Sequence, residues 1–116
     1  MTIDRTPAHL SDMLTFVREL RAIGGDATLE AYRGQRVLNL AVEKLFINLG
    51  EAAQRVPEAE RTNIGDVPWR QIIGLHNILA HGYEQVDHET LYRTVTNELA
   101  AVEDALAAGL AGAGDV

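Results

Sequence analysis

Residues 68–87 read PWRQIIGLHNILAHGYEQVD, the most informative stretch of the chain. Pro68 and Trp69 favour a helix start, because proline is tolerated in a first helical turn, and Gly82 favours a stop. The spacing therefore predicts a helix from Trp69 to about Ala80 or His81. An arc of about 160° on this helix collects the residues expected to face the protein interior. They are Ile72, Ile73, Leu75, His76, Leu79, Ala80 and Tyr83.

A polar set lies on the flank of the same predicted helix. Asn77 follows Arg70 by seven positions and His81 follows it by eleven, which places the three within about 40° of one another. A guanidinium, a carboxamide and an imidazole in one line could bind a phosphate and move a proton. A solvated flank, in which Asn77 or His81 serves only as a helix cap, is the other interpretation and the commoner one for such spacing.

Two further helices are predicted before this stretch. The first begins with Thr6 as its cap and ends at Gly24, and it carries an apolar stripe at helical spacing. The second runs from a cap at Asp26 to Val56, with a break near Gly34, and is followed by a polar stretch over residues 58–66. The stripes consist of Leu10, Met13, Leu14, Val17 and Leu20, and of Leu38, Ala41, Val42, Leu45, Leu49, Ala52, Ala53 and Val56.

A last helix is predicted after the central stretch. Asp87 can cap it, and apolar residues recur as far as Leu106, after which the small, Gly-rich residues 107–116 are expected to form a flexible tail. No segment alternates with the period of a strand. Together these patterns predict an all-α fold, an up-and-down four-helix-type bundle with an extra short helix or kink.

Composition narrows the class of protein. With 116 residues, of which 47% are hydrophobic and 23% charged, the chain is expected to fold as one domain over residues 1–106. The net charge of −7 argues against a protein that coats nucleic acid through its overall electrostatic field, although binding through a local basic patch remains open. No membrane span or signal peptide is recognised, so a cytoplasmic location is expected.

No metal or cofactor is predicted. The chain has no cysteine, so thiolate metal sites and disulfides are excluded. His76 and His81 are five positions apart and therefore about 140° apart around a helix, which does not bring them together as ligands. No Gly-rich phosphate loop or metalloprotease motif occurs.

The run from Asn77 to Tyr83, NILAHGY, resembles the signature of the HEPN superfamily, specifically that of the HepT-type toxins of HepT/MntA toxin–antitoxin pairs. The preceding PWR at residues 68–70, the following VD at residues 86–87 and the GEAA at residues 50–53 resemble the same family. The resemblance covers about residues 8–106. It implies an HEPN-like helical bundle that forms a homodimer, or a higher oligomer with its antitoxin, and acts as a metal-independent endoribonuclease on RNA.

The resemblance also implies roles for individual residues. His81 matches the catalytic histidine and Asn77 the polar residue of the active site. Tyr83 matches the tyrosine to which an MntA-like nucleotidyltransferase antitoxin attaches AMP, which neutralises the toxin in these type VII systems. An imidazole can deprotonate a ribose 2′-hydroxyl for attack on the adjacent phosphodiester, while a cation stabilises the developing phosphoryl charge.

One position departs from the family pattern, because His76 stands where the family has its arginine. Arginine is a permanently charged, bidentate phosphate ligand, and histidine is not. Three interpretations stay open: His76 is a second acid or base, Arg70 partly supplies the missing charge, or the protein is an attenuated variant. The alternative function is a non-catalytic HEPN-scaffold module that binds a protein or RNA partner.

Overall fold

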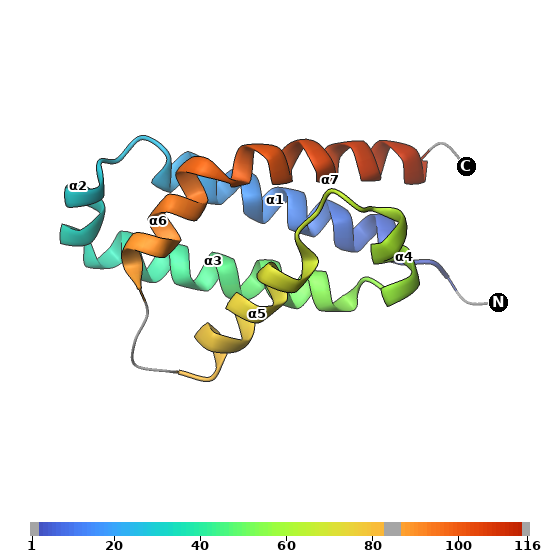
Figure 1. Cartoon of the computed structure of the whole chain (residues 1–116), viewed down its shortest axis with the longest axis horizontal. Coiled ribbons are helices and arrows are strands. Elements are labelled where there is room, and N and C mark those ends of the chain that lie inside the picture. Colours follow the sequence, from blue (N-terminus) through green and yellow to red (C-terminus); the bar gives the residue numbers. More distant parts are fainter. Residues whose placement is uncertain (1–2, 83–86, 115–116) are drawn as a thin grey trace.

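The computed structural model describes residues 3–82 and 87–114, and within them it is entirely helical (Figure 1). The predicted all-α fold is confirmed. Tyr83 lies outside the described residues. Seven helices follow one another in this part of the chain: α1 Thr6–Gly24, α2 Leu29–Gly34, α3 Arg36–Arg55, α4 Glu58–Asn63, α5 Trp69–Ala80, α6 His88–Asn97 and α7 Leu99–Gly114.

The body of the protein is a bundle in which α1 packs against both α3 and α7. In Figure 1, α1 runs in the opposite direction to α3 and to α7, as expected for an up-and-down arrangement. The apolar stripes predicted from sequence supply most of the core, because one face of each long helix turns inward. Fully buried members include Leu10, Val17, Leu20, Val42 and Leu49.

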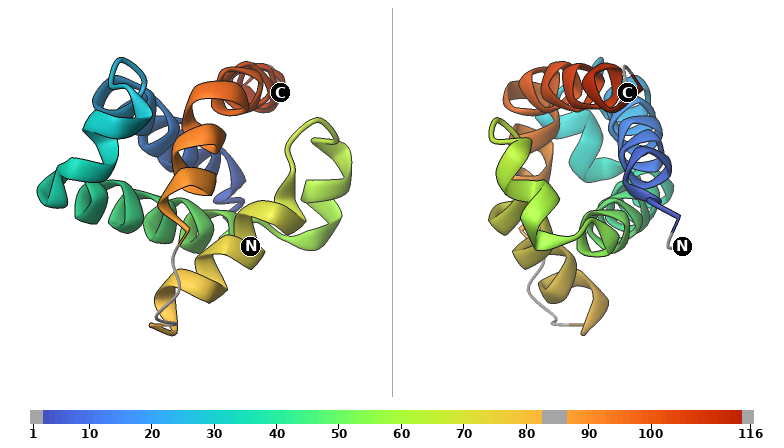
Figure 2. Two further views of the ribbon diagram at one scale, coloured as in Figure 1. Left: turned by 60° about the vertical axis from the view of Figure 1, so that its left-hand side comes forward. Right: turned by 90° about the vertical axis from the view of Figure 1, so that its right-hand side faces the viewer.

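Helix α5 takes a different course from the rest. It packs mainly against α3, and its C-terminal end projects from the body of the bundle (Figures 1 and 2). A helix held on one side leaves its other faces open to solvent or to a partner. The fold therefore presents the end of the central sequence stretch at its surface.

Two predicted helix starts are wrong in detail. Helix α1 begins at Thr6, but Thr6 does not cap it; the Thr6 N–H donates to Asp4 Oδ1 at 2.9 Å, so Asp4 satisfies that free donor. Helix α2 is capped by Thr28, whose hydroxyl accepts from the Ala31 N–H at 3.1 Å, and not by Asp26. The expected break falls at Gln35, where extended backbone separates α2 from α3.

The second half of the chain adds three differences. The polar stretch contains the short helix α4, and the last helix is interrupted at Glu98, between α6 and α7. The cap at Asp87 is confirmed, since its Oδ1 accepts from the N–H groups of Glu89 and Thr90. The last helix does not end near Leu106 but continues to Gly114, and Gly109 approaches Ile64 closely. No helix in the described part of the chain is long and apolar enough to cross a membrane.

Candidate functional site

The contact between α3 and α5 fixes the position of the signature segment. A β-carbon added at Gly50 of α3 would overlap the β-carbon of His76 and lie 2.7 Å from its Cγ, so the glycine lets α5 approach closely. The imidazole is buried, with 8% of the residue exposed, and its Nδ1 lies 2.9 Å from the Ile47 carbonyl oxygen. Because a carbonyl only accepts, Nδ1 carries the proton and donates. His76 therefore joins two helices.

His81 lies directly after the last residue of α5. Its N–H donates to the Asn77 carbonyl at 3.3 Å, and the next N–H, that of Gly82, donates to the Leu79 carbonyl at 3.3 Å. Gly82 has φ of 69°, a left-handed conformation that glycine adopts without strain. The glycine thus ends the helix, and His81 is exposed at the projecting tip of α5.

Asn77 is tied to the end of α3. Its side-chain oxygen accepts from Gln54 Nε2 at 3.3 Å. Arg61 of α4 closes the same end, since its Nε donates to the Val56 carbonyl at 2.9 Å and its Nη2 to the Gln54 carbonyl at 3.1 Å. These bonds satisfy carbonyls that a helix C-terminus leaves free. They join α3, α4 and α5 around one groove.

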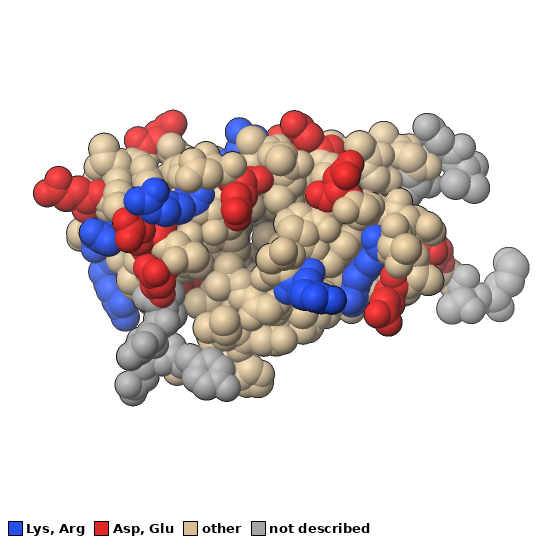
Figure 3. All heavy atoms as spheres, viewed as in Figure 1, with Lys and Arg blue, Asp and Glu red and all other residues tan. Residues whose placement is uncertain are grey.

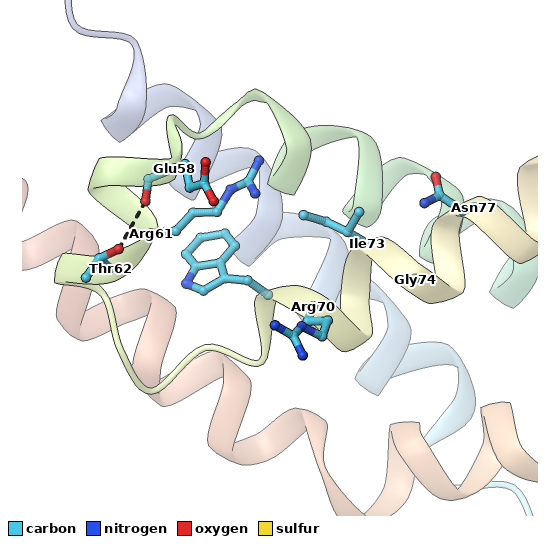
Figure 4. A pocket seen from close by; sticks show the side chains of 8 residues that line it. Glu58, Arg61, Thr62, Arg70, Ile73, Gly74 and Asn77 are labelled. Carbon is cyan, nitrogen blue, oxygen red and sulfur yellow. Dashed lines mark hydrogen bonds between the residues drawn. The ribbon is translucent and has the colours of Figure 1, made fainter.

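The groove lies between α4 and α5 and has a volume of about 520 Å³ (Figure 4). Ile73 and Gly74 separate Arg70 from Asn77 along α5. Basic side chains gather over this part of the surface, with acidic ones nearby (Figure 3). The lining residues are Glu58, Arg61, Thr62, Trp69, Arg70, Ile73, Gly74 and Asn77.

The predicted polar stripe is therefore partly assembled in one place. Arg70 and Asn77 line the groove, and His81 follows one helical turn beyond Asn77 on the same flank. His76 lies on the opposite, buried side, as its place on the helical wheel predicts, while Ala80 is exposed and not buried. Residues 3–82 and 87–114 contain no group of three or more metal-ligating side chains placed to hold an ion.

Six of the eight lining residues were not among the predicted site residues. Of these, Trp69 was assigned to the helix start and to the PWR motif, and Arg61 lies in the polar stretch over residues 58–66. Gly74 was not singled out. A signal for Gly74 exists in the sequence, since an interior glycine in a helix needs a reason. Arg61 has no such signal and Trp69 has only its place in the PWR motif, because the packing of α4 beside α5 is what brings the two side chains together.

Comparison with known proteins agrees with the motif. The family described as HepT-like, Ribonuclease HepT-like, matches residues 13–108. "Putative RNase MJ1380" of Methanocaldococcus jannaschii is 25% identical over 96 residues, covering 83% of this chain and 88% of the relative. "Probable ribonuclease HepT" of Thermococcus cleftensis is 21% identical over 95 residues, covering 82% and 86%. No solved structure matches significantly. Because the family match spans most of its length, the chain belongs to the HepT-like ribonuclease family.

Proposed function

We propose that the protein is the toxin of a type VII HepT/MntA pair, a metal-independent endoribonuclease that acts in the cytoplasm. The observation that carries the proposal is the exposed His81 at the tip of α5, one turn beyond Asn77 and the groove. The His81 imidazole takes the proton of a ribose 2′-hydroxyl, and the 2′-oxygen attacks the adjacent phosphorus. The 5′-oxygen leaves and is protonated. The products are a 2′,3′-cyclic phosphate and a 5′-hydroxyl.

His76 does not take over the phosphate-binding role of the motif arginine in this proposal. That side chain is buried and donates to the Ile47 carbonyl, so it does not reach a phosphate on the surface in this conformation. Arg70 is exposed and shares the groove with Asn77. A guanidinium is permanently charged and suits phosphate oxygens. Arg70 precedes His81 by eleven residues along α5, so in this proposal it binds a phosphate elsewhere on the RNA strand and not the reacting one.

A homodimer would place two such sites together. Large apolar side chains are exposed on the two helices that meet at His76: Val37 and Leu40 of α3 are 81% and 48% exposed, and Ile78 of α5 is 47% exposed. Exposed apolar side chains on these two helices support association with a second copy. Sedimentation as a monomer at micromolar concentration would contradict a shared active site.

The proposed control is covalent. An MntA-like nucleotidyltransferase would transfer AMP from ATP to the Tyr83 hydroxyl and release pyrophosphate. Tyr83 follows His81 by two positions, so the AMP group would be attached two residues from the proposed catalytic histidine in the sequence. Incubation with ATP and the partner should add the mass of an AMP group, and Tyr83→Phe should prevent it. Modification that persists in Tyr83→Phe would refute this assignment.

A second candidate function is favoured by the burial of His76. Without a cation at the motif position, the HEPN scaffold could serve as a non-catalytic module that binds RNA or a protein. The two functions are separated by testing the wild type, His76→Arg and His81→Ala on a panel of RNAs. The ribonuclease proposal predicts cleavage by the wild type that His81→Ala abolishes. Binding that His81→Ala leaves unchanged, with no cleavage by any variant, would support the module.

A further inference from the structure

Gly74 occupies an unusual position in α5. Glycine destabilises the interior of a helix relative to alanine, so it is normally kept where packing demands it. At Gly50 packing does demand it. At Gly74 a β-carbon would meet nothing within 4 Å. The open space next to Gly74 is the groove itself, which the residue lines. The missing side chain therefore keeps the groove floor clear, as a ligand site would require.

The other lining residues have the chemistry of a nucleotide site. The Trp69 indole is partly buried, and its Nε1–H donates to the Ile64 carbonyl at 3.0 Å, which holds the ring in place. Arg70 is exposed beside it. Aromatic rings on which bases stack, combined with arginines along the backbone, are the usual means of binding single strands. One carboxylate, that of Glu58, also lines the groove and opposes an anion.

We propose that this groove binds single-stranded RNA, with one base over Trp69 and Gly74 and a phosphate at Arg70, and that it leads the strand toward His81. The inference rests on the proposed ribonuclease function. Arg70 and His81 are separated by roughly 16 Å along α5 at the rise of an α-helix. Arg70 thus holds a phosphate some nucleotides away from the cleaved bond and is a positioning residue. A duplex does not fit, because its bases are stacked inside it.

Binding is tested without cleavage by using labelled 2′-O-methyl RNA, which lacks the attacking hydroxyl, and fluorescence anisotropy. Gly74→Met, at a position where a β-carbon meets nothing within 4 Å, fills the groove floor and should weaken binding by about tenfold or more, the effect of one lost stacked base. Ala101→Met, at an exposed position of α7, is the matched control and should bind as the wild type does. Glu58→Gln should tighten binding. A duplex of the same sequence should be bound weakly and show no sensitivity to Gly74→Met.

Arg70→Ala provides a second, independent test. It should lower the slope of log affinity against log salt by about one, the signature of one lost phosphate contact. In cleavage assays it should raise KM more than it lowers kcat, which a general loss of structure would not do. Wild-type affinity and salt slope in both Arg70→Ala and Gly74→Met would overturn the proposal.

Different results would contradict the groove proposal and the ribonuclease proposal. If Gly74→Met cleaves RNA with the KM of the wild type, the groove proposal is wrong and the ribonuclease stands. If the wild type cleaves no RNA but binds the 2′-O-methyl strand in a manner sensitive to Gly74→Met and Arg70→Ala, the groove proposal stands and the ribonuclease is wrong.

Discussion

Gly50→Ala should destabilise the protein even though alanine favours helices. The added methyl group overlaps the β-carbon of His76 and lies 2.7 Å from its Cγ, so α5 must move away from α3. Inserting a carbon into a packed contact typically costs about 1–3 kcal/mol. Alanine in place of glycine returns up to about 1 kcal/mol of helix propensity. Because the added methyl group overlaps the β-carbon of His76, the cost lies toward the upper end of that range, and the expected net loss is about 1–2 kcal/mol.

The assay is thermal unfolding followed by circular dichroism. A loss of this size should lower Tm by about 4–8 °C in a domain of this length. Gly74→Ala is the matched control, because it makes the same change inside α5 where a β-carbon meets nothing within 4 Å. It should raise Tm by a few degrees. Because α5 carries Asn77 and His81, Gly50→Ala should also reduce cleavage.

Substitutions of His76 test whether its β-carbon is the atom that the added methyl group meets. His76→Ala keeps the β-carbon that meets the added methyl group and should not rescue Gly50→Ala. His76→Gly removes that carbon, so Gly50→Ala should lower Tm less in a His76→Gly background than in a His76→Ala background. A Gly50→Ala protein with a Tm equal to or above that of the wild type would refute the close packing of α5 on α3.

Three further predictions concern other parts of the fold. Tyr32 is fully buried, its hydroxyl has no hydrogen-bond partner in the described part of the chain, and burial together with the nearby Glu43 raises its pKa to about 12. Tyr32→Phe should therefore raise Tm, because it removes a buried hydroxyl without a partner. Because the phenol of the unfolded chain ionises first, the wild type should lose stability between about pH 10 and 12, and Tyr32→Phe should not show this loss. Hydrogen bonds, first from the Thr90 hydroxyl and second from backbone N–H groups, lower the pKa of Asp87. The ionised carboxylate therefore stabilises the folded protein above the unfolded pKa of about 3.9, and this stabilisation is lost as pH falls below that value. In Asp87→Asn the free energy of unfolding should depend less on pH in this range. Leu40→Glu, at an exposed apolar position, should shift sedimentation toward the monomer with an unchanged helical spectrum, and an unchanged sedimentation coefficient would argue against α3 as the dimer face.

The sequence predicted the long helices well, because each buries one stripe against the core. The stripe from Leu10 to Leu20 and the start and end of α5 follow from 3.6-residue spacing and from Pro68 and Gly82. The sequence predicted an extra short helix or kink but did not locate helix α4, because a short helix with no buried residues carries no apolar period. The helical tail was missed, because local sequence spacing does not reveal tertiary contacts such as that of Gly109 with Ile64.

The candidate site, too, could be predicted from the sequence only in part. Arg70, Asn77 and His81 could be aligned from the sequence, because one helix carries all three. The role of His76 in joining α3 and α5 could not be read there, since it depends on Ile47 and Gly50, which lie far earlier in the chain. The groove likewise needs the placement of α4 beside α5. Local periodicity therefore predicts which residues share a flank, and tertiary packing decides what they face.

Cleavage of single-stranded RNA in EDTA by the wild type and by His81→Ala tests the proposed chemistry most directly. Melting curves of both proteins check that any loss of cleavage does not come from a loss of folded structure. The proposed mechanism predicts that the wild type produces fragments ending in 2′,3′-cyclic phosphate and that His81→Ala produces none. Equal cleavage by both proteins, or fragments ending in a 3′-hydroxyl, would contradict a reaction in which His81 activates the ribose 2′-hydroxyl.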